Sequence, residues 1–153
     1  MNINIQLDDL SSQESQSIVR EHMAGMLANT PIESVHALPL EKLRQPNITF
    51  WTAWKGSDLC GCGALQTLDA HHGEVKTMRT RTKFLRQGIG QAVLNHIINH
   101  ATQKGLNRLS LETGSSDAFS AARAMYLRNG FEICEPFGDY KLDPLSVFMT
   151  KHI

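Results

Sequence analysis

Two glycines at the start of a long helical pattern constrain this chain more than any other feature. Gly88 and Gly90 follow Arg86 and precede apolar residues at helical spacing, within residues 84–105. Glycine adopts left-handed backbone conformations at little cost and lets a ligand approach the main chain closely. The first N–H groups of a helix have no partner inside the helix and lie at the positive end of its dipole. Two interpretations follow: a tight turn that needs glycine, or a backbone cradle for an anion such as a phosphate.

Periodicity along the rest of the chain predicts an α/β (α+β) fold. Alternating polar and apolar residues predict strands, and apolar residues three or four apart predict helices. The expected strands are residues 2–7, 48–55, 59–68, 74–80, 108–112, 131–134 and 147–151. The expected helices run from residue 11 or 12 to about 29, over 40–45, from the glycine pair to Gly105, and over 117–128. The order βα(α)βββαβαββ predicts a mixed, mostly antiparallel central sheet with helices on both faces, in a single domain of residues 1–153.

Composition limits the partners of this chain. Its 153 residues are 41% hydrophobic, and 15 basic residues balance 15 acidic ones. A balanced chain has no overall field to attract nucleic acid or an anionic membrane, so neither partner is expected. No apolar run reaches the length of a membrane span, and the first residues lack the layout of a signal peptide. With an odd count of three cysteines, we expect reduced thiols and a cytoplasmic location.

Two pairs of metal-ligating residue types receive the plainer interpretation. His96 and His100 are four residues apart on an expected helix, but no glutamate follows His96, so we expect a solvated helix face. Cys60 and Cys62 are expected on one face of a strand, where they pack. No metal site is predicted.

A second segment connects the glycine pair to a known family. Ala122, Tyr126, Gly130 and Phe131 are spaced as Ala-x-x-x-Tyr-x-x-x-Gly-Phe at the end of an expected helix. Together with the glycine stretch, this pattern resembles the GNAT (GCN5-related) N-acetyltransferase superfamily. There, a pyrophosphate loop of the form Arg/Gln-x-x-Gly-x-Gly/Ala precedes such a helix. The resemblance covers the whole chain, including the order of its elements.

Three further runs look like one branch of that superfamily. They read LETG over residues 111–114, FGDY over 137–140 and SVFM over 146–149. Together they resemble the small bacterial branch that is named for an indole-acetate acetyltransferase.

The resemblance implies acetyl-CoA as cofactor, held by the glycine loop and by the strand before it. The residues so assigned are Met78, Arg79, Thr80, Arg86, Gln87, Gly88, Ile89, Gly90 and Gln91. Two positions depart from the family pattern. Leu85 occupies the first motif position in place of arginine or glutamine, and Phe119 stands where many members carry an asparagine that contacts the cofactor. We expect the backbone cradle to be retained and these side-chain contacts to be lost.

Acetylation of an amine by a thioester involves two proton transfers, one from the attacking amine and one to the leaving thiolate. An alkylamine of pKa near 10.4 is almost wholly protonated at pH 7, so a general base assists its attack. Glu74 stands at the spacing of the base in the histone-acetylating branch, and Glu112 ends the next strand. Either glutamate is a candidate base, and either is equally consistent with a solvated strand end. The resemblance makes Tyr126 the acid that protonates the leaving thiolate, while a core tyrosine is the alternative.

The acceptor side is expected around the first helix, the loop after it and the last two strands. Candidate residues there are Glu33, His36, Asp139 and Tyr140, and exposed loop positions are the alternative. Two acidic residues would suit a cationic amine.

The predicted function is acetyl-CoA-dependent N-acetylation of a small-molecule amine, by direct transfer in a ternary complex. A non-catalytic acyl-CoA-binding module or sensor is one alternative, which the two departures favour. A protein or peptide N-acetyltransferase is another. The identity of the acceptor stays open, as does pairing of two copies as a homodimer.

Overall fold

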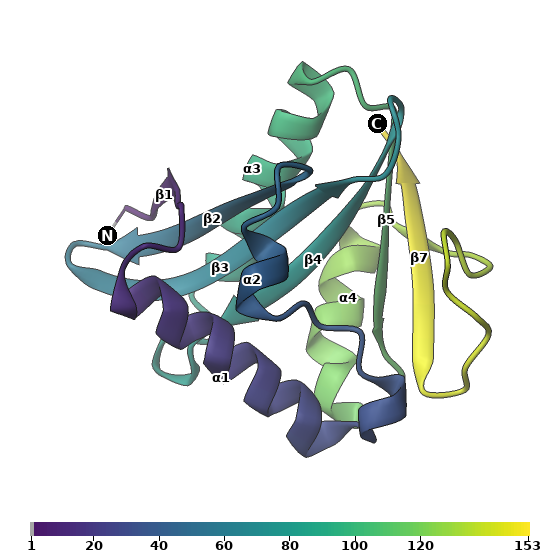
Figure 1. The fold of residues 1–153 in the computed structure, drawn as a ribbon, viewed down its shortest axis with the longest axis horizontal. Helices are drawn as coiled ribbons and strands as arrows, with labels where there is room; N and C mark the ends of the chain where they lie inside the picture. The colour runs from purple at the N-terminus through teal and green to yellow at the C-terminus, as the bar shows by residue number, and fades with distance from the viewer. Residues whose placement is uncertain (1) are drawn as a thin grey trace.

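A computed structural model describes residues 2–153, which form one seven-stranded sheet with helices on both faces (Figure 1). The strands are β1 (Asn4–Leu7), β2 (Ile48–Lys55), β3 (Asp58–Thr67), β4 (His72–Thr80), β5 (Arg108–Gly114), β6 (Glu132–Ile133) and β7 (Ser146–His152). The helices are α1 (Gln13–Asn29), α2 (Leu40–Leu43), α3 (Ile89–Gln103) and α4 (Ser120–Arg128). The predicted element order is therefore confirmed. The helix expected over 117–128 is divided into a 3-10 turn, Asp117–Phe119, and α4.

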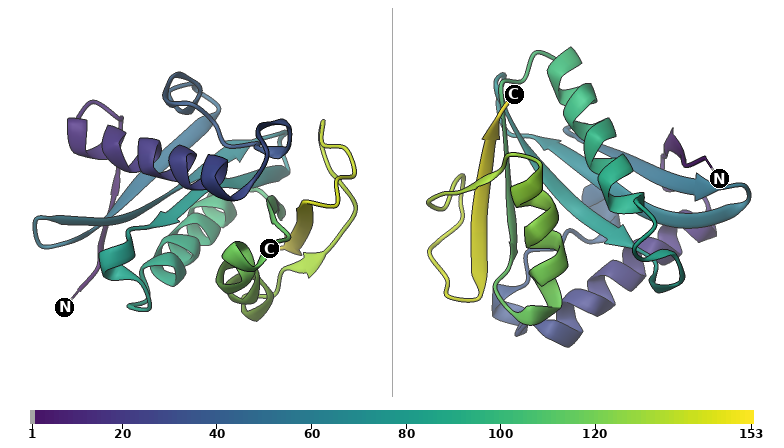
Figure 2. Two further views of the ribbon diagram at one scale, coloured as in Figure 1. Left: turned by 90° about the horizontal axis from the view of Figure 1, so that it is seen from below. Right: turned by 180° about the vertical axis from the view of Figure 1, so that it is seen from behind.

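The sheet has the strand order β1-β2-β3-β4-β5-β7-β6. Every neighbouring pair is antiparallel except β4 and β5, which are parallel. This confirms the predicted mixed, mostly antiparallel sheet. Helices α1 and α2 cover one face, and α3 and α4 cover the other (Figure 2).

The parallel pair in the middle of the sheet comes apart along its length. Only His72–Glu74 of β4 pairs with Arg108–Ser110 of β5, and beyond these residues the two strands diverge (Figure 1). A β-bulge in β4 accompanies the divergence: Cys62 of β3 lies opposite Arg79, whereas Ala64 lies opposite Lys76. A bulge bends its strand and increases the local twist. The result is a gap between β4 and β5 in the centre of the sheet.

Apolar residues fill both sides of the sheet. The stripe predicted for α3 is buried against the sheet, and its buried members are Ile89, Val93, Leu94, Ile97 and Ala101. On the opposite face, Ile18 and Val19 of α1 pack with Phe50 and Leu59 of the sheet. The two cores thus pack against β3 and β4 from both sides.

Two expectations about side-chain direction are wrong. Cys60 is buried with the α3 core and Cys62 with the α1 core, so they do not share a face. The cause is a register shift in β2–β3 next to Cys60, which interrupts the period-two alternation. His96 and His100 are half-buried and pack edge-on against Trp51, with ring centroids 5.5 and 4.9 Å away, so this helix face is not simply solvated.

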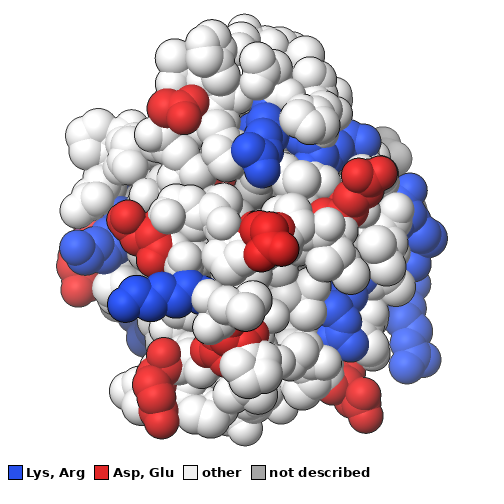
Figure 3. All heavy atoms as spheres, turned by 90° about the vertical axis from the view of Figure 1, so that its right-hand side faces the viewer, with Lys and Arg blue, Asp and Glu red and all other residues white. Residues whose placement is uncertain are grey.

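The surface reflects the balanced composition. Basic and acidic side chains are interspersed on the face that carries β7, with no large patch of one sign (Figure 3). Among residues 2–153, no helix is long and apolar enough to cross a membrane. The same range contains no group of three or more His, Cys, Asp and Glu residues placed to hold a metal ion.

Gly63 should be required for the packing of α3 on the sheet. A Cβ atom at this position would lie 2.5 Å from Val93 Cγ1 and 2.7 Å from Met78 Sδ. We expect Gly63→Ala to lower the free energy of unfolding in urea by about 1–3 kcal/mol through overpacking. In a Val93→Ala background, which removes the nearest atom, the same change should cost less. An equal loss in both backgrounds would contradict this contact.

Candidate active site

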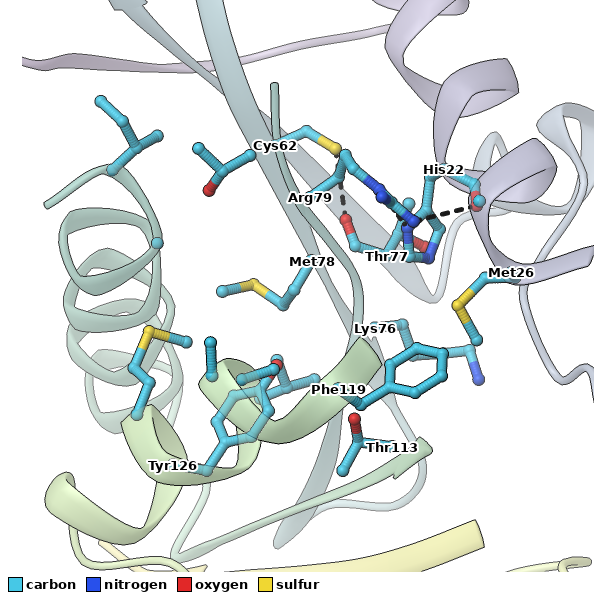
Figure 4. A pocket seen from close by; sticks show the side chains of 18 of the residues that line it. His22, Met26, Cys62, Lys76, Thr77, Met78, Arg79, Thr113, Phe119 and Tyr126 are labelled. Carbon is cyan, nitrogen blue, oxygen red and sulfur yellow. Dashed lines mark hydrogen bonds between the residues drawn. The ribbon is translucent and has the colours of Figure 1, made fainter. Parts of the chain in front are cut away.

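A cleft of about 630 Å³ occupies the gap between β4 and β5. Its lining comes from both faces of the sheet: His22 and Met26 belong to α1, whereas Gly90 belongs to α3 and Tyr126 to α4. Figure 4 shows these walls, with α1 and α4 on opposite sides of β4. The cleft therefore passes through the sheet, so two ligands can meet in it from opposite faces.

One end of the cleft lies at the N-terminus of α3. Gly88 caps this helix with a φ of 82°, and an added Cβ would meet nothing within 4 Å. Glycine is thus needed for the left-handed conformation, and the space in front of it is open. The first-turn N–H groups of Ile89, Gly90 and Gln91 have no partner within the helix, and all three residues line the cleft. This geometry fits the anion cradle better than a simple turn.

Arg86 belongs to the same loop and has a φ of 63°, a conformation that few residues other than glycine adopt. It lines the cleft, and so does Leu85, which is 52% exposed. Gln87 does not line the cleft, because its side chain accepts a 2.6 Å hydrogen bond from Lys55. Of the predicted loop residues, Gln87 is therefore the one that does not line the cleft.

Gln91 has a second role. Its side-chain amide exchanges hydrogen bonds of 2.7 and 2.9 Å with the amide of Asn129, at the end of α4. This pair ties the N-terminal turn of α3 to α4 and fixes the width of the cleft on that face.

The middle of the cleft is formed by the second half of β4. The Arg81 N–H donates to the Cys60 carbonyl of β3, so strand alternation also turns the Arg79 N–H toward β3. The Thr80 N–H is left facing the gap. Met78 packs its side chain with the α3 core. Arg79 lines the cleft through its side chain, which extends toward α1 (Figure 4).

Tyr126 lies on the α4 side of the cleft. It is 5% exposed, and its ring packs edge-on against Phe131 at 5.7 Å. Burial raises the pKa of its hydroxyl above the ordinary value of 10, so the group stays protonated at neutral pH. Within residues 2–153 the hydroxyl has no hydrogen-bond partner, although the residue lines the cleft. It is therefore available to donate a proton to a group bound there.

The other end of the cleft holds a buried polar cluster. Lys76 Nζ lies 3.0 Å from Glu74 Oε2, and the two side chains are only 9% and 6% exposed. The Tyr140 hydroxyl, from the loop between β6 and β7, donates to the same carboxylate oxygen at 2.5 Å and accepts from Lys76 at 2.9 Å. Sequence reasoning missed Lys76, although its place two residues after Glu74 on the same strand puts both side chains on one face.

Glu112 of β5 and His36 of the α1–α2 loop complete this end. Burial raises the pKa of Glu112 above its ordinary value of 4.5. The Ser146 hydroxyl, His36 and Lys76 oppose this shift, and the neighbouring Glu74 charge adds to it. The rings of His36 and Tyr140 meet edge-on at 5.0 Å. Four predicted site residues, Glu74, Glu112, His36 and Tyr140, are therefore brought together from four separate segments.

The two remaining acceptor-side candidates, Glu33 and Asp139, are exposed and do not line the cleft. Their loops are instead tied together by Ser34, whose hydroxyl donates to Asp143 at 2.7 Å. This bond joins the α1–α2 loop to the β6–β7 loop.

Phe119 gives the cleft an apolar side chain at the position where many family members carry a polar one. Its ring packs directly on Gly114, where an added Cβ would overlap it, and lies beside Thr113 in the cleft (Figure 4). The wall at this point is therefore hydrophobic.

The fold and the cleft together define an acyl-CoA-dependent transferase. Comparison with known proteins agrees: a model of the acetyltransferase (GNAT) family matches residues 15–131. The chain belongs to this family, whose members use acetyl-CoA.

Individual relatives cover most or nearly all of the chain. The uncharacterized N-acetyltransferase YsnE of Bacillus subtilis is 54% identical over 99% of this chain and 100% of its own. The IAA acetyltransferase of Azospirillum brasilense is 40% identical over 79% of this chain and 78% of its own. A GNAT acetyltransferase from Elizabethkingia anophelis, crystallised with acetyl-CoA, has the same fold, with a TM-score of 0.72, 20% identity and 99% of each chain covered. The predicted family, fold, enzyme class and cofactor are thus confirmed.

Gly88→Asp should abolish the anion cradle. It places a negative charge where a diphosphate would bind, and at about 4 Å near a protein surface such repulsion costs about 4 kcal/mol. We expect the Kd for CoA, measured by calorimetric titration, to rise about 100-fold or more. Gly105→Asp is the matched control, because Gly105 ends the same helix with a φ of 84° and equally open space. Equal affinities of the two variants would place the cofactor site elsewhere.

Proposed function

We propose that this protein transfers an acetyl group directly from acetyl-CoA to the amine of a small molecule. The observation that carries the proposal is the passage of one cleft through the sheet, from the α3 cradle to the buried cluster around Glu112. When bound, acetyl-CoA supplies the thioester from the α3 and α4 face. The amine then enters from the α1 face.

Direct transfer is favoured over a covalent enzyme intermediate by the state of the cysteines. Cys62 lines the cleft but is buried, and burial raises the pKa of its thiol to about 12. A thiol with this pKa is not a nucleophile near pH 7, because the thiolate is the reactive form. Its Sγ also donates a hydrogen bond to the Thr77 carbonyl at 3.2 Å.

Glu112 is the better placed of the two candidate bases. Glu74 Oε2 already accepts from Tyr140 and Lys76, so this carboxylate holds the cluster together. Glu112 has a pKa raised by burial, and a general base works best when its pKa approaches the working pH. Tyr126, on the opposite face, serves as the acid for the leaving thiolate, because it lines the cleft with a protonated hydroxyl that has no protein acceptor within residues 2–153.

The closed acceptor end supports a small molecule rather than a polypeptide as acceptor. The Ser34–Asp143 bond joins the two loops that flank this end. His36 and Tyr140, one from each loop, also pack against each other. An extended peptide would have to displace these contacts. The direct test is release of CoA thiol from acetyl-CoA with a panel of amines, amino acids, polyamines and peptides, where activity on peptides alone would overturn the proposal.

Glu112→Gln and Glu74→Gln should separate catalysis from structure. Glu112→Gln should lower kcat by about 10²–10⁴-fold, the usual contribution of a general base. Glu74→Gln leaves Lys76 buried without its partner, so it should lower the free energy of unfolding by about 3–5 kcal/mol. Equal kcat for wild type and Glu112→Gln would remove Glu112 from the mechanism.

The pH dependence of stability should differ between wild type and Glu112→Gln. A raised pKa means that the folded state disfavours the ionised carboxylate. The contribution of Glu112 is therefore fully present below 4.5 and is lost as pH rises through the raised pKa. Relative to wild type, Glu112→Gln should gain stability over that rise, as measured by urea unfolding at several pH values.

Tyr126→Phe removes one hydroxyl and keeps the ring that packs on Phe131. We expect kcat to fall by about 10²–10⁴-fold, since proton donation to the leaving group is lost. The affinity for CoA, measured by calorimetry, should change little. If kcat is unchanged, Tyr126 is a core residue and the acid lies elsewhere.

A further inference from the structure

Arg79 extends into the cleft from β4 without a carboxylate partner. The ion pairs between basic and acidic side chains within residues 2–153 are Lys76–Glu74 and Arg81–Glu21. Glu21, the acidic residue of α1 closest to this region, is thus already engaged by Arg81 at 2.9 Å. A partly buried guanidinium is usually paired with an acid, since burial of an isolated charge is costly.

The surroundings hold the Arg79 guanidinium in one place. Its Nε donates to His22 Nδ1 at 3.1 Å, and its Nη2 donates to the His22 carbonyl at 3.2 Å. His22 is buried, and burial lowers the pKa of its imidazole to about 3, so the ring is neutral and accepts this bond. His22 therefore positions the arginine without neutralising it.

Helix α1 is also shaped around this group. An added Cβ at Gly25 would lie 2.6 Å from Arg79 Nη2 and 2.9 Å from Nη1. Glycine in the middle of a helix costs about 1 kcal/mol relative to alanine, so its presence here has a packing reason. The absence of a side chain at Gly25 makes room for the guanidinium.

One nitrogen of Arg79 remains free to bind a ligand. Nη1 has no protein acceptor. Within residues 2–153, the fully buried side-chain nitrogen and oxygen atoms without a hydrogen-bond partner are Thr77 Oγ1 and Ser146 Oγ, and Nη1 is not among them. Nη1 is therefore accessible, and both Arg79 and Gly25 line the cleft. The exposed edge of the guanidinium thus forms part of the cleft wall on the α1 face.

We propose that Arg79 binds a carboxylate of the acceptor, so that the acceptor is an amino acid or another amino-carboxylate. This inference rests on the proposed function. Glu112 and Arg79 lie on the same side of the sheet gap. The amine of the acceptor would lie toward Glu112 and its carboxylate toward Arg79. The acyl donor is a poorer source of the anion, because its diphosphate cradle lies at α3, on the opposite face.

The test compares amino acids with the amines that they give on decarboxylation. Suitable pairs are phenylalanine with phenethylamine, tryptophan with tryptamine, and leucine with 3-methylbutylamine. The ratio of kcat/KM within a pair is measured for wild type and for Arg79→Met. We expect Arg79→Met to reduce the preference for the amino acid by about 10- to 100-fold, the usual worth of a charged hydrogen bond. Differences in amine pKa cancel, because both enzymes receive the same compounds.

Two further variants keep the comparison sharp. Arg81→Met is the matched control, since Arg81 pairs with Glu21 and does not line the cleft, and its ratio should equal that of wild type. Gly25→Ala keeps the charge but displaces the guanidinium, so it should also reduce the ratio. Circular dichroism and thermal unfolding, measured on each variant, report whether the protein is folded. An Arg79→Met variant that does not fold is replaced by Arg79→Lys, which should give a smaller reduction.

The outcomes separate this inference from the proposed function. Acetylation of amines and amino acids with ratios unchanged in Arg79→Met and Gly25→Ala overturns the inference and leaves the function. If wild type acetylates none of the six compounds, calorimetric binding to CoA-saturated protein decides the inference. Tighter binding of the amino acids, lost in Arg79→Met, supports it. Equal or absent binding overturns it.

Discussion

The divergence of β4 from β5 is the constraint on which the rest of the site depends. Parallel strands normally continue side by side, but here the pairing stops after Glu74. Thr77, at the bulge, has a φ of 55°, which is rare for a β-branched residue. Its hydroxyl is also buried without a partner. Such strain costs about 1–3 kcal/mol and persists only where the surroundings enforce it. Packing of the two apolar cores offsets this cost, and the strained bulge lies where the sheet opens into a gap.

The gap lets the two faces of one sheet contribute different chemical groups to a single cleft. The α3 and α4 face offers unpaired N–H groups, an open glycine and the protonated Tyr126, all suited to an anionic thioester donor. The α1 face offers carboxylates and cations suited to a polar acceptor. Because β4 contributes residues to both walls, its bulge fixes the position of one set of groups relative to the other. Groups that act on the attacking and leaving atoms must be held in this way to be effective.

Periodicity was sufficient to predict the element order, because helices and strands depend on residues close in sequence, and that order in turn indicated a mixed sheet. The glycine stretch by itself left a tight turn and an anion cradle open, and the resemblance to the family favoured the cradle. Neither periodicity nor local motifs could predict which residues of distant loops come into contact. Glu33 and His36 were equivalent candidates in one loop. The structure distinguishes them, because His36 lines the cleft and packs on Tyr140, whereas Glu33 is exposed. The bulge next to Cys60 likewise reversed the direction of a side chain, since a single extra residue defeats period-two reasoning. The pairing of Glu74 with Lys76 and Tyr140 joins residues that are up to 66 positions apart.

The charges on the α1 face bear directly on which acceptor would fit there. Glu74 and Lys76 neutralise each other at 3.0 Å, so an ionised Glu112 leaves one net negative charge at the inner end. Arg79 leaves one positive charge beside α1. A simple amine would satisfy the first charge and leave the second desolvated and unpaired, which is unfavourable. An acceptor that carries both an ammonium and a carboxylate would pair both. Electrostatic complementarity of this kind selects between ligands chiefly by penalising those that leave a buried charge without a partner.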